Sequence, residues 1–138
     1  MIAARFNQEI VDELLSGCVA RLEELGVRSS KIAVHRVPGA FELPVAAKLA
    51  AETRKFASVI CLGAVIRGDT PHFDFVAGEA ARGIQNVAIE TGVPIIFGVL
   101  TTNTEEQARQ RLDSGKRAAE AAVEMAGIAK KIRNPKSE

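Results

Sequence analysis

Four short apolar stretches recur along the chain, and longer stretches with helical periodicity separate them. The apolar stretches cover residues 1–5, 31–37, 57–66 and 94–101. The third and fourth are apolar at both odd and even positions, which is typical of strands covered on both faces of a parallel sheet. We therefore expect four strands in a parallel sheet, with the last two buried on both faces.

Five segments between and after these strands are predicted to be helices. They begin near residue 10 and at residues 41, 73, 104 and 116, and the long ones end near residues 25, 54, 91 and 132. Gly26 closes the first helix, and Pro44 lies in the first turn of the second. Thr104 and Gln107 match the capping-box pattern that opens a short fourth helix. Residues 134–138 are expected to form a frayed tail.

The predicted order of elements is β-α-β-α-β-α-β-α-α. Right-handed crossovers between parallel strands then place helices on both faces of the sheet. The fold class is α/β, a three-layer α/β/α sandwich with a four-stranded parallel sheet, and it is flavodoxin-like. Because no linker, repeat or low-complexity segment interrupts the 138 residues, we expect residues 1–138 to form one domain.

Composition and charge exclude several functional classes. The 18 Lys and Arg residues nearly balance 17 Asp and Glu residues, so the chain lacks the basic field typical of nucleic-acid or membrane-surface binding. Its apolar start stops at Arg5, too early for a signal peptide or a spanning helix. Cys18 and Cys61 lie in apolar segments and are expected to be buried free thiols. We expect a cytoplasmic protein without a metal site.

Ligands of open α/β sheets bind beyond the carboxyl ends of the strands. The segments that follow the predicted strands are residues 6–7, 38–42, 67–72 and 101–103. Function is therefore expected at these four places, which share one edge of the sheet.

The segment after the third strand combines turn-forming residues with a histidine. Gly68 allows a sharp turn and a close approach to a ligand. Asp69 and Thr70 are favourable N-cap residues, and Pro71 is favoured in a first helical turn. The free N–H groups of such a helix start, together with the helix dipole, can bind a phosphate. The simpler alternative is an ordinary strand-to-helix turn.

His72 favours the phosphate interpretation, because it falls in the first turn of the same helix. The helix dipole disfavours a second proton on its ring, whereas a bound phosphate favours one, so the ring can exchange protons near neutral pH. The alternative is a histidine that only caps or packs. His35 lies inside the second strand and is expected to be structural or at the surface.

Aromatic residues suggest what lies beside the phosphate. Phe6 precedes Asn7, and Phe41 precedes Glu42, each directly after a strand. A flat apolar ring next to a hydrogen-bonding group is suited to a planar heterocycle with polar substituents. Phe97 lies within the last strand. The other three, Phe56, Phe73 and Phe75, are expected in the core.

Four basic residues near the last two helices could supply a guanidinium for the phosphate. They are Arg109, Arg111, Lys116 and Arg117. Arg111 is the candidate, because a guanidinium fork suits phosphate oxygens. The alternative is that these residues form solvated helix faces.

These segments together resemble the lumazine synthase family. The matching stretches are residues 4–7, 37–44, 63–74, 97–101 and 105–108. The string Val-Ile-Arg-Gly-x-Thr-Pro-His-Phe-Asp over residues 65–74 is highly specific to that family. Two departures are a start inside the family's first strand, without the preceding arm, and a shorter connection between Arg111 and Lys116.

The resemblance implies a transferase of riboflavin biosynthesis. It would condense 5-amino-6-(D-ribitylamino)uracil with 3,4-dihydroxy-2-butanone 4-phosphate to 6,7-dimethyl-8-ribityllumazine, with no cofactor. Phe6 would stack on the pyrimidine. The ribityl side would be lined by Ala40, Phe41 and Glu42. Backbone groups would come from Ala64, Val65 and Ile66.

The resemblance also implies the phosphate side of the site and the assembly. The butanone phosphate would be held by Asp69, Thr70 and Arg111, with Lys116 as a further contact. His72 would transfer protons, and Phe97 would come from a neighbouring subunit. The family forms pentamers, which in some members build a 60-subunit icosahedral shell, and riboflavin synthase is a candidate partner. Two rival functions are a shell component in which catalysis is secondary and a flavodoxin-like flavin-binding module.

Overall fold

The central sheet has four strands, all parallel, as the apolar pattern predicts. The computed structural model describes residues 1–137, and its strands are β1 (Ile2–Ala4), β2 (His35–Val37), β3 (Val59–Ile66) and β4 (Ile95–Thr102). The strand order is β2-β1-β3-β4. The two long strands β3 and β4 pair over their full length. Every residue of β3 up to Val65 is buried, as expected for a strand covered on both faces.

All five predicted helices are present within residues 1–137. They are α1 (Gln8–Glu24), α2 (Leu43–Glu52), α3 (His72–Thr91), α4 (Glu105–Arg109) and α5 (Ser114–Arg133). Short 3-10 turns lie at η1 (Ser29–Lys31), η2 (Ala40–Glu42) and η3 (Pro135–Ser137). The capping box of α4 is confirmed in a shifted form. Thr104 Oγ1 accepts from Gln107 N at 3.1 Å, but Gln107 Oε1 accepts from Asn103 N at 2.8 Å rather than from Thr104.

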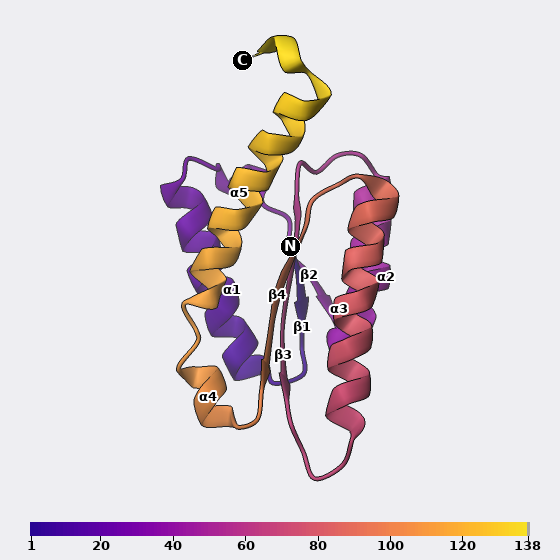
Figure 1. Ribbon diagram of the computed structural model, residues 1–138. Coiled ribbons are helices and arrows are strands. Elements are labelled where there is room, and N and C mark those ends of the chain that lie inside the picture. The colour runs from indigo at the N-terminus through magenta and orange to yellow at the C-terminus, as the bar shows by residue number, and fades with distance from the viewer. Residues whose placement is uncertain (138) are drawn as a thin grey trace.

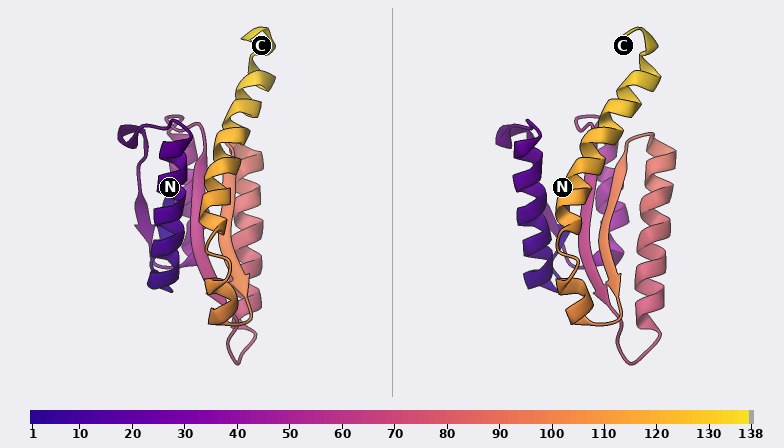
Figure 2. Two further views of the ribbon diagram at one scale, coloured as in Figure 1. Left: turned by 90° about the vertical axis from the view of Figure 1, so that its left-hand side faces the viewer. Right: turned by 60° about the vertical axis from the view of Figure 1, so that its left-hand side comes forward.

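The helices cover the two faces of the sheet in pairs (Figure 1). α1 and α5 pack against each other on one face, and α2 and α3 pack on the other (Figure 2). Each face has its own apolar core, around Leu14 and Leu62 on the first and around Leu43 and Cys61 on the second. The predicted three-layer sandwich is confirmed. Because the strand order reverses at β1, the segments after β1 and β3 meet at the switch point where doubly wound folds bind ligands.

One predicted boundary is wrong. The second apolar stretch forms a strand only over His35–Val37, because its partner β1 offers just three residues for pairing. The predicted frayed tail includes a 3-10 turn over Pro135–Ser137, which follows a hydrogen bond from Asn134 N to Lys130 O at 2.9 Å, and its fraying stays a prediction. Glu138 lies outside the described residues. α5 thus extends well past the end of the sheet (Figure 2).

The core prediction for phenylalanine is correct for two residues and wrong for one. Phe56 and Phe73 are partly buried against the core on the α2–α3 side. Phe75 is 67% exposed. The reason is helical phase, because α3 buries Ala80, Ile84 and Val87, and position 75 lies on a different side of that helix.

Both cysteines are buried free thiols, as predicted. Cys18 lies in the core on the α1–α5 side and Cys61 in the core on the other face of the sheet. Burial raises the pKa of the Cys18 thiol to about 11 and that of Cys61 to about 12. Both therefore stay protonated at neutral pH and are poor nucleophiles.

The pairing of α1 with α5 depends on a very close backbone approach at Gly115. A Cβ added there would lie 3.0 Å from Cα of Leu14 and closer still to the Leu14 carbonyl oxygen. Both atoms belong to the backbone of α1, so no side-chain rotation could relieve the contact. The first turn of α5 therefore accepts only glycine at this position.

Candidate functional site

A cleft of about 680 Å³ lies at the carboxyl edge of the sheet, next to the ends of β1 and β3. Nine of the predicted site residues line it: Phe6, Ala40, Phe41, Glu42, Ala64, Val65, Ile66, Thr70 and His72. Parallel strands bring their carboxyl ends to one edge, which explains why segments far apart in sequence meet here. A cavity therefore lies where the sequence predicts the functional site.

The end of β1 forms the first wall of the cleft, through Phe6. Phe6 N donates to Pro38 O at 3.0 Å, and the Phe6 ring is 71% exposed. Asn7 follows in a left-handed conformation, with φ of 58°, and its Nδ2 donates to Ala64 O at 2.8 Å. The Asn7 amide, expected to face a ligand, thus joins the end of β1 to β3. We infer that it orients Phe6.

The turn η2 forms the second wall. Glu42 N donates to Gly39 O at 3.2 Å. Phe41 is 58% exposed and lines the cleft. Gly39 was missed in the sequence, although it lies inside the matching segment. A Cβ at Gly39 would lie 3.4 Å from Glu42 Oε1 and 3.9 Å from Phe6 Cβ. A side chain there would therefore enter the space between the two walls.

The end of β3 forms the floor. Ala64 and Val65 are buried, whereas Ile66 is half-buried where the strand reaches the edge. Because Asn7 already occupies one lone pair of the Ala64 carbonyl, that group has reduced capacity for a ligand. Ala64 belongs to the core on the α1–α5 side, and Val65 belongs to the core on the α2–α3 side.

In the loop over residues 67–71 the structure differs from two predictions of the sequence analysis. Gly68 has neither a positive φ nor any atom within 4 Å of an added Cβ, so the turn itself does not require glycine. The N-cap of α3 is Pro71, with φ of −70°, rather than Asp69 or Thr70. Thr70 Oγ1 instead accepts from His72 N at 3.4 Å. The position at which a helix begins commonly differs by one or two residues from the expected one.

His72 is the first residue of α3 and is exposed on the cleft. Phe75 and Val76, which the sequence analysis missed, follow at the i+3 and i+4 positions and line the same cavity. Helical phase relative to His72 is the signal that could have identified them. The second histidine, His35, is exposed, as predicted. It lies on β2, the edge strand at the opposite end of the sheet from β4.

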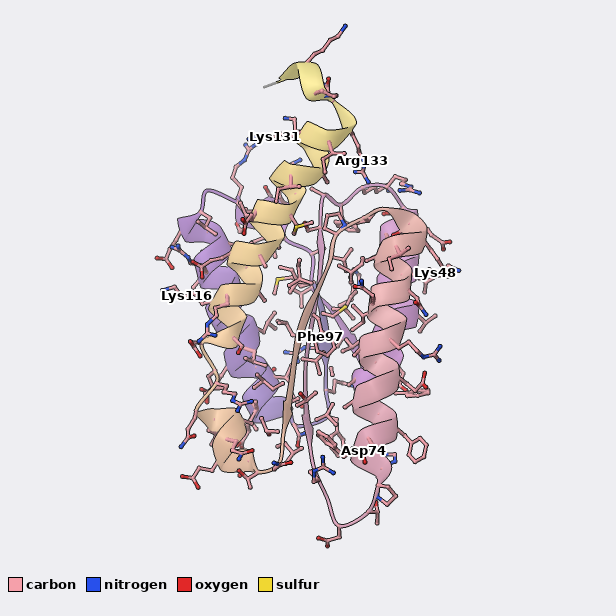
Figure 3. All side chains as sticks on the ribbon, viewed as in Figure 1. Lys48, Asp74, Phe97, Lys116, Lys131 and Arg133 are labelled. Atoms are coloured by element: carbon pink, nitrogen blue, oxygen red, sulfur yellow. The ribbon has the colours of Figure 1, made fainter. Side chains whose placement is uncertain are left out.

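Four predicted site residues do not line this cleft: Phe97, Asp69, Arg111 and Lys116. Phe97 lies on the edge strand β4 and is 42% exposed. Figure 3 shows Lys116 on α5, across the sheet from Asp74 at the start of α3. Arg111 is exposed just after α4. For these residues, participation in the site remains a prediction.

The side chains that line the cleft are suited to acid–base chemistry on a flat, polar ring. They combine four phenylalanine rings with one carboxylate, one hydroxyl and one imidazole. Among residues 1–137, no three His, Cys, Asp or Glu side chains are grouped closely enough to hold a metal ion. No helix in the same part of the chain is long and apolar enough to cross a membrane.

Comparison with known proteins agrees with this architecture. A sequence model of the family described as 6,7-dimethyl-8-ribityllumazine synthase matches residues 1–130, which include all four strands and the whole cleft. A 6,7-dimethyl-8-ribityllumazine synthase of Syntrophus aciditrophicus (strain SB) is 49% identical over 134 residues, which cover 94% of this chain and 87% of that relative. Together with the cleft at the switch point, this match shows that the chain belongs to the 6,7-dimethyl-8-ribityllumazine synthase family.

Proposed function

We propose that this protein is a transferase that condenses 5-amino-6-(D-ribitylamino)uracil with 3,4-dihydroxy-2-butanone 4-phosphate. The products are 6,7-dimethyl-8-ribityllumazine, phosphate and water. The observation that carries the proposal is the placement of His72 in one cleft with Phe6, Phe41 and Glu42, in a chain of this family. The named relative supports the same reaction.

The reaction needs proton transfers more than it needs a strong nucleophile. An aromatic amine of the pyrimidine attacks the ketone to form an imine, phosphate leaves, and a second amine closes the ring. Each step moves a proton on or off the substrate, and His72 is the group we assign to these transfers. Holding both reactants in place can supply several powers of ten in rate.

The ring-binding roles follow from the walls of the cleft. Phe6 offers an exposed ring for stacking on the pyrimidine. Glu42 is a half-buried carboxylate that can accept hydrogen bonds from ribityl hydroxyls, beside Ala40 and Phe41. We place the backbone edges of Ala64, Val65 and Ile66 against the ring.

The phosphate site is placed at the loop before α3. Thr70 contributes its hydroxyl there, and the start of a 20-residue helix favours a negative charge. We include Asp69, Arg111 and Lys116 as phosphate contacts on the strength of the family resemblance. Asp69 is exposed, and any role for it is through its backbone N–H, because its carboxylate would repel phosphate.

The direct test is to mix the two substrates with the protein and record the absorbance of the lumazine product. The expected result is product formation that is linear in protein concentration and faster than the uncatalysed background. Product formation at the background rate would contradict the proposal. If the protein instead binds flavin tightly without any turnover, the flavin-binding function that the doubly wound sheet also allows becomes the better one.

Arg111→Ala is expected to raise KM for the butanone phosphate about tenfold, because a guanidinium bound to phosphate contributes more than a neutral hydrogen bond. KM for the pyrimidine should change by less than about twofold, since that substrate carries no phosphate. Steady-state kinetics with each substrate varied in turn measures both constants.

The matched control is Arg109→Ala, on the neighbouring helix α4. The Arg109 guanidinium is already paired with Glu9 at 3.2 Å and with Glu105 at 3.7 Å. The Arg109→Ala substitution is therefore expected to leave both KM values unchanged. An equal rise in both KM values for the Arg111 variant would show that Arg111 does not bind the substrate phosphate.

We further propose that the protein assembles at least into pentamers and that Phe97 completes the cleft of a neighbouring subunit. Single chains rarely leave many large apolar side chains uncovered. On this chain Val45, Leu49 and Ile89 are all exposed, and none of them lines the cleft. Pentamers could build a 60-subunit shell, which would allow riboflavin synthase as a partner. The free thiols fit a reducing compartment, so we propose the cytoplasm.

Light scattering coupled to size exclusion, at micromolar protein, is expected to give a mass at least five times that of the 14.7 kDa chain. Phe97→Ala should lower kcat/KM without changing this mass, because the ring is expected to act at the site and not to hold the assembly. A monomer that is fully active would contradict a shared site.

A further inference from the structure

The side chain of Arg67 closes the loop that leads from β3 into α3. Its backbone N donates to Thr102 O at 2.8 Å, directly after the last β3–β4 pair. Its Nε donates to Asn103 Oδ1 at 2.9 Å. Arg67 is thus fixed to the end of β4 through both its backbone and its side chain.

The same guanidinium also contacts the first turn of α3. Its Cζ lies 4.5 Å from the centroid of the Phe73 ring, and Nη1 lies 3.6 Å from Asp74 Oδ1. Phe73 and Asp74 directly follow His72 in the chain. One side chain therefore joins residue 67, at the start of the loop, to two residues in the first turn of α3.

We propose that Arg67 is a positioning residue that holds the loop over residues 68–71, and with it Thr70 and His72, in the arrangement that receives the substrate phosphate. The phosphate role of this loop rests on the proposed function. Arg67 itself does not line the cleft, so it acts through Phe73 and Asp74 and not by touching the substrate.

The energetics favour positioning over a mainly structural role. The Arg67 side chain is 45% exposed and its partner Asp74 is 62% exposed, and such ion pairs contribute little to the stability of the fold. Loop geometry is more sensitive, because a shift of about 1 Å in a catalytic group can cost about a hundredfold in rate.

Lysine cannot reproduce these contacts. The planar guanidinium stacks on Phe73 while it donates sideways to Asn103, whereas an ammonium is a compact charge without a flat face. We therefore expect Arg67→Lys to keep the positive charge but to lose much of the positioning.

The test uses inorganic phosphate as the probe and the two histidines of the full-length protein as reporters. With 13C-labelled histidine, phosphate is expected to shift the ring signals of His72 and to leave those of His35 unchanged. In Arg67→Gln the same shift should need at least about tenfold more phosphate. Arg67→Lys should also need more phosphate than the wild type. The melting temperature of each variant is recorded alongside.

Two further variants make the result decisive. Arg82→Gln removes an ion pair of the same kind, with Glu79, farther along α3, and should respond to phosphate like the wild type. Asn103→Ala removes one anchor of Arg67 while keeping its charge, and should weaken the phosphate response even if Arg67→Gln folds poorly. An unchanged phosphate response in both Arg67→Gln and Asn103→Ala would overturn the proposal, as would an equal loss in Arg82→Gln.

Kinetics separate this inference from the proposed function. Arg67→Gln should lower kcat for lumazine formation and raise KM for the butanone phosphate at least about tenfold, with a smaller change for the pyrimidine. If the wild type makes lumazine and Arg67→Gln has unchanged constants, the positioning role fails and the function stands. If the wild type makes no lumazine but phosphate shifts His72 only when Arg67 is present, the function fails and the positioning role stands.

Discussion

Replacing His72 with alanine is expected to lower kcat for lumazine formation by about a hundredfold or more, because a positioned general acid–base group contributes about 10²–10⁴ in rate. The side chain is exposed at the start of α3, so the variant should fold and assemble like the wild type. Steady-state kinetics at saturating concentrations of both substrates measures the loss.

His35→Ala is the matched control for this prediction. His35 is the other histidine of the chain, it is exposed on β2, and it does not line the cleft. Its replacement should leave kcat unchanged. If His72→Ala retains wild-type kcat, proton transfer belongs to another group, and orientation of the substrates must supply most of the rate.

Gly115→Ala is expected to lower the free energy of unfolding by about 2–3 kcal/mol, because an inserted methyl group in a tightly packed contact has a cost of this order. The added Cβ would meet the Leu14 backbone of α1, which cannot rotate away. α1 and α5 would have to separate, and the core between them would open. Urea denaturation at fixed protein concentration measures the change, since assembly makes stability concentration-dependent.

Gly127→Ala provides the control within the same helix α5. A Cβ at Gly127 would meet nothing within 4 Å, so this substitution should stabilise the helix slightly, by about 0.5–1 kcal/mol. Opposite signs for the two substitutions are the signature of a close helix crossing at Gly115. Equal effects would show that helix propensity alone decides both.

The sequence predicts the elements well because their signals are local. Periodicity distinguishes the strands from the helices, and the apolar residues of β3 indicate burial on both faces. Thr104 and Gln107 mark the start of α4 within one residue. Where the prediction is wrong, as for the length of β2, the partner strand and not the local sequence sets the limit.

Much of the cleft is predictable for a topological reason. Parallel strands joined by right-handed crossovers end at one edge, so the residues after each strand must gather there. Phe6, Phe41, Glu42 and His72 come from three such segments and line one cleft. Their type indicates the chemistry, and their positions after the strands indicate that they meet.

By itself the sequence determined which segments become strands or helices, because hydrophobic periodicity is a local property of the chain. It also determined which edge of the sheet carries the site, because the residues that follow parallel strands gather at one edge. Only the tertiary structure decided how that edge is held together. Asn7 reaches Ala64 across 57 residues, and Arg67 reaches Asn103 across 36. Such contacts depend on side-chain rotamers and on the approach of distant backbones, which no local pattern encodes. The close crossing at Gly115 was decided in the same way, by the backbone of α1 that lies beside it.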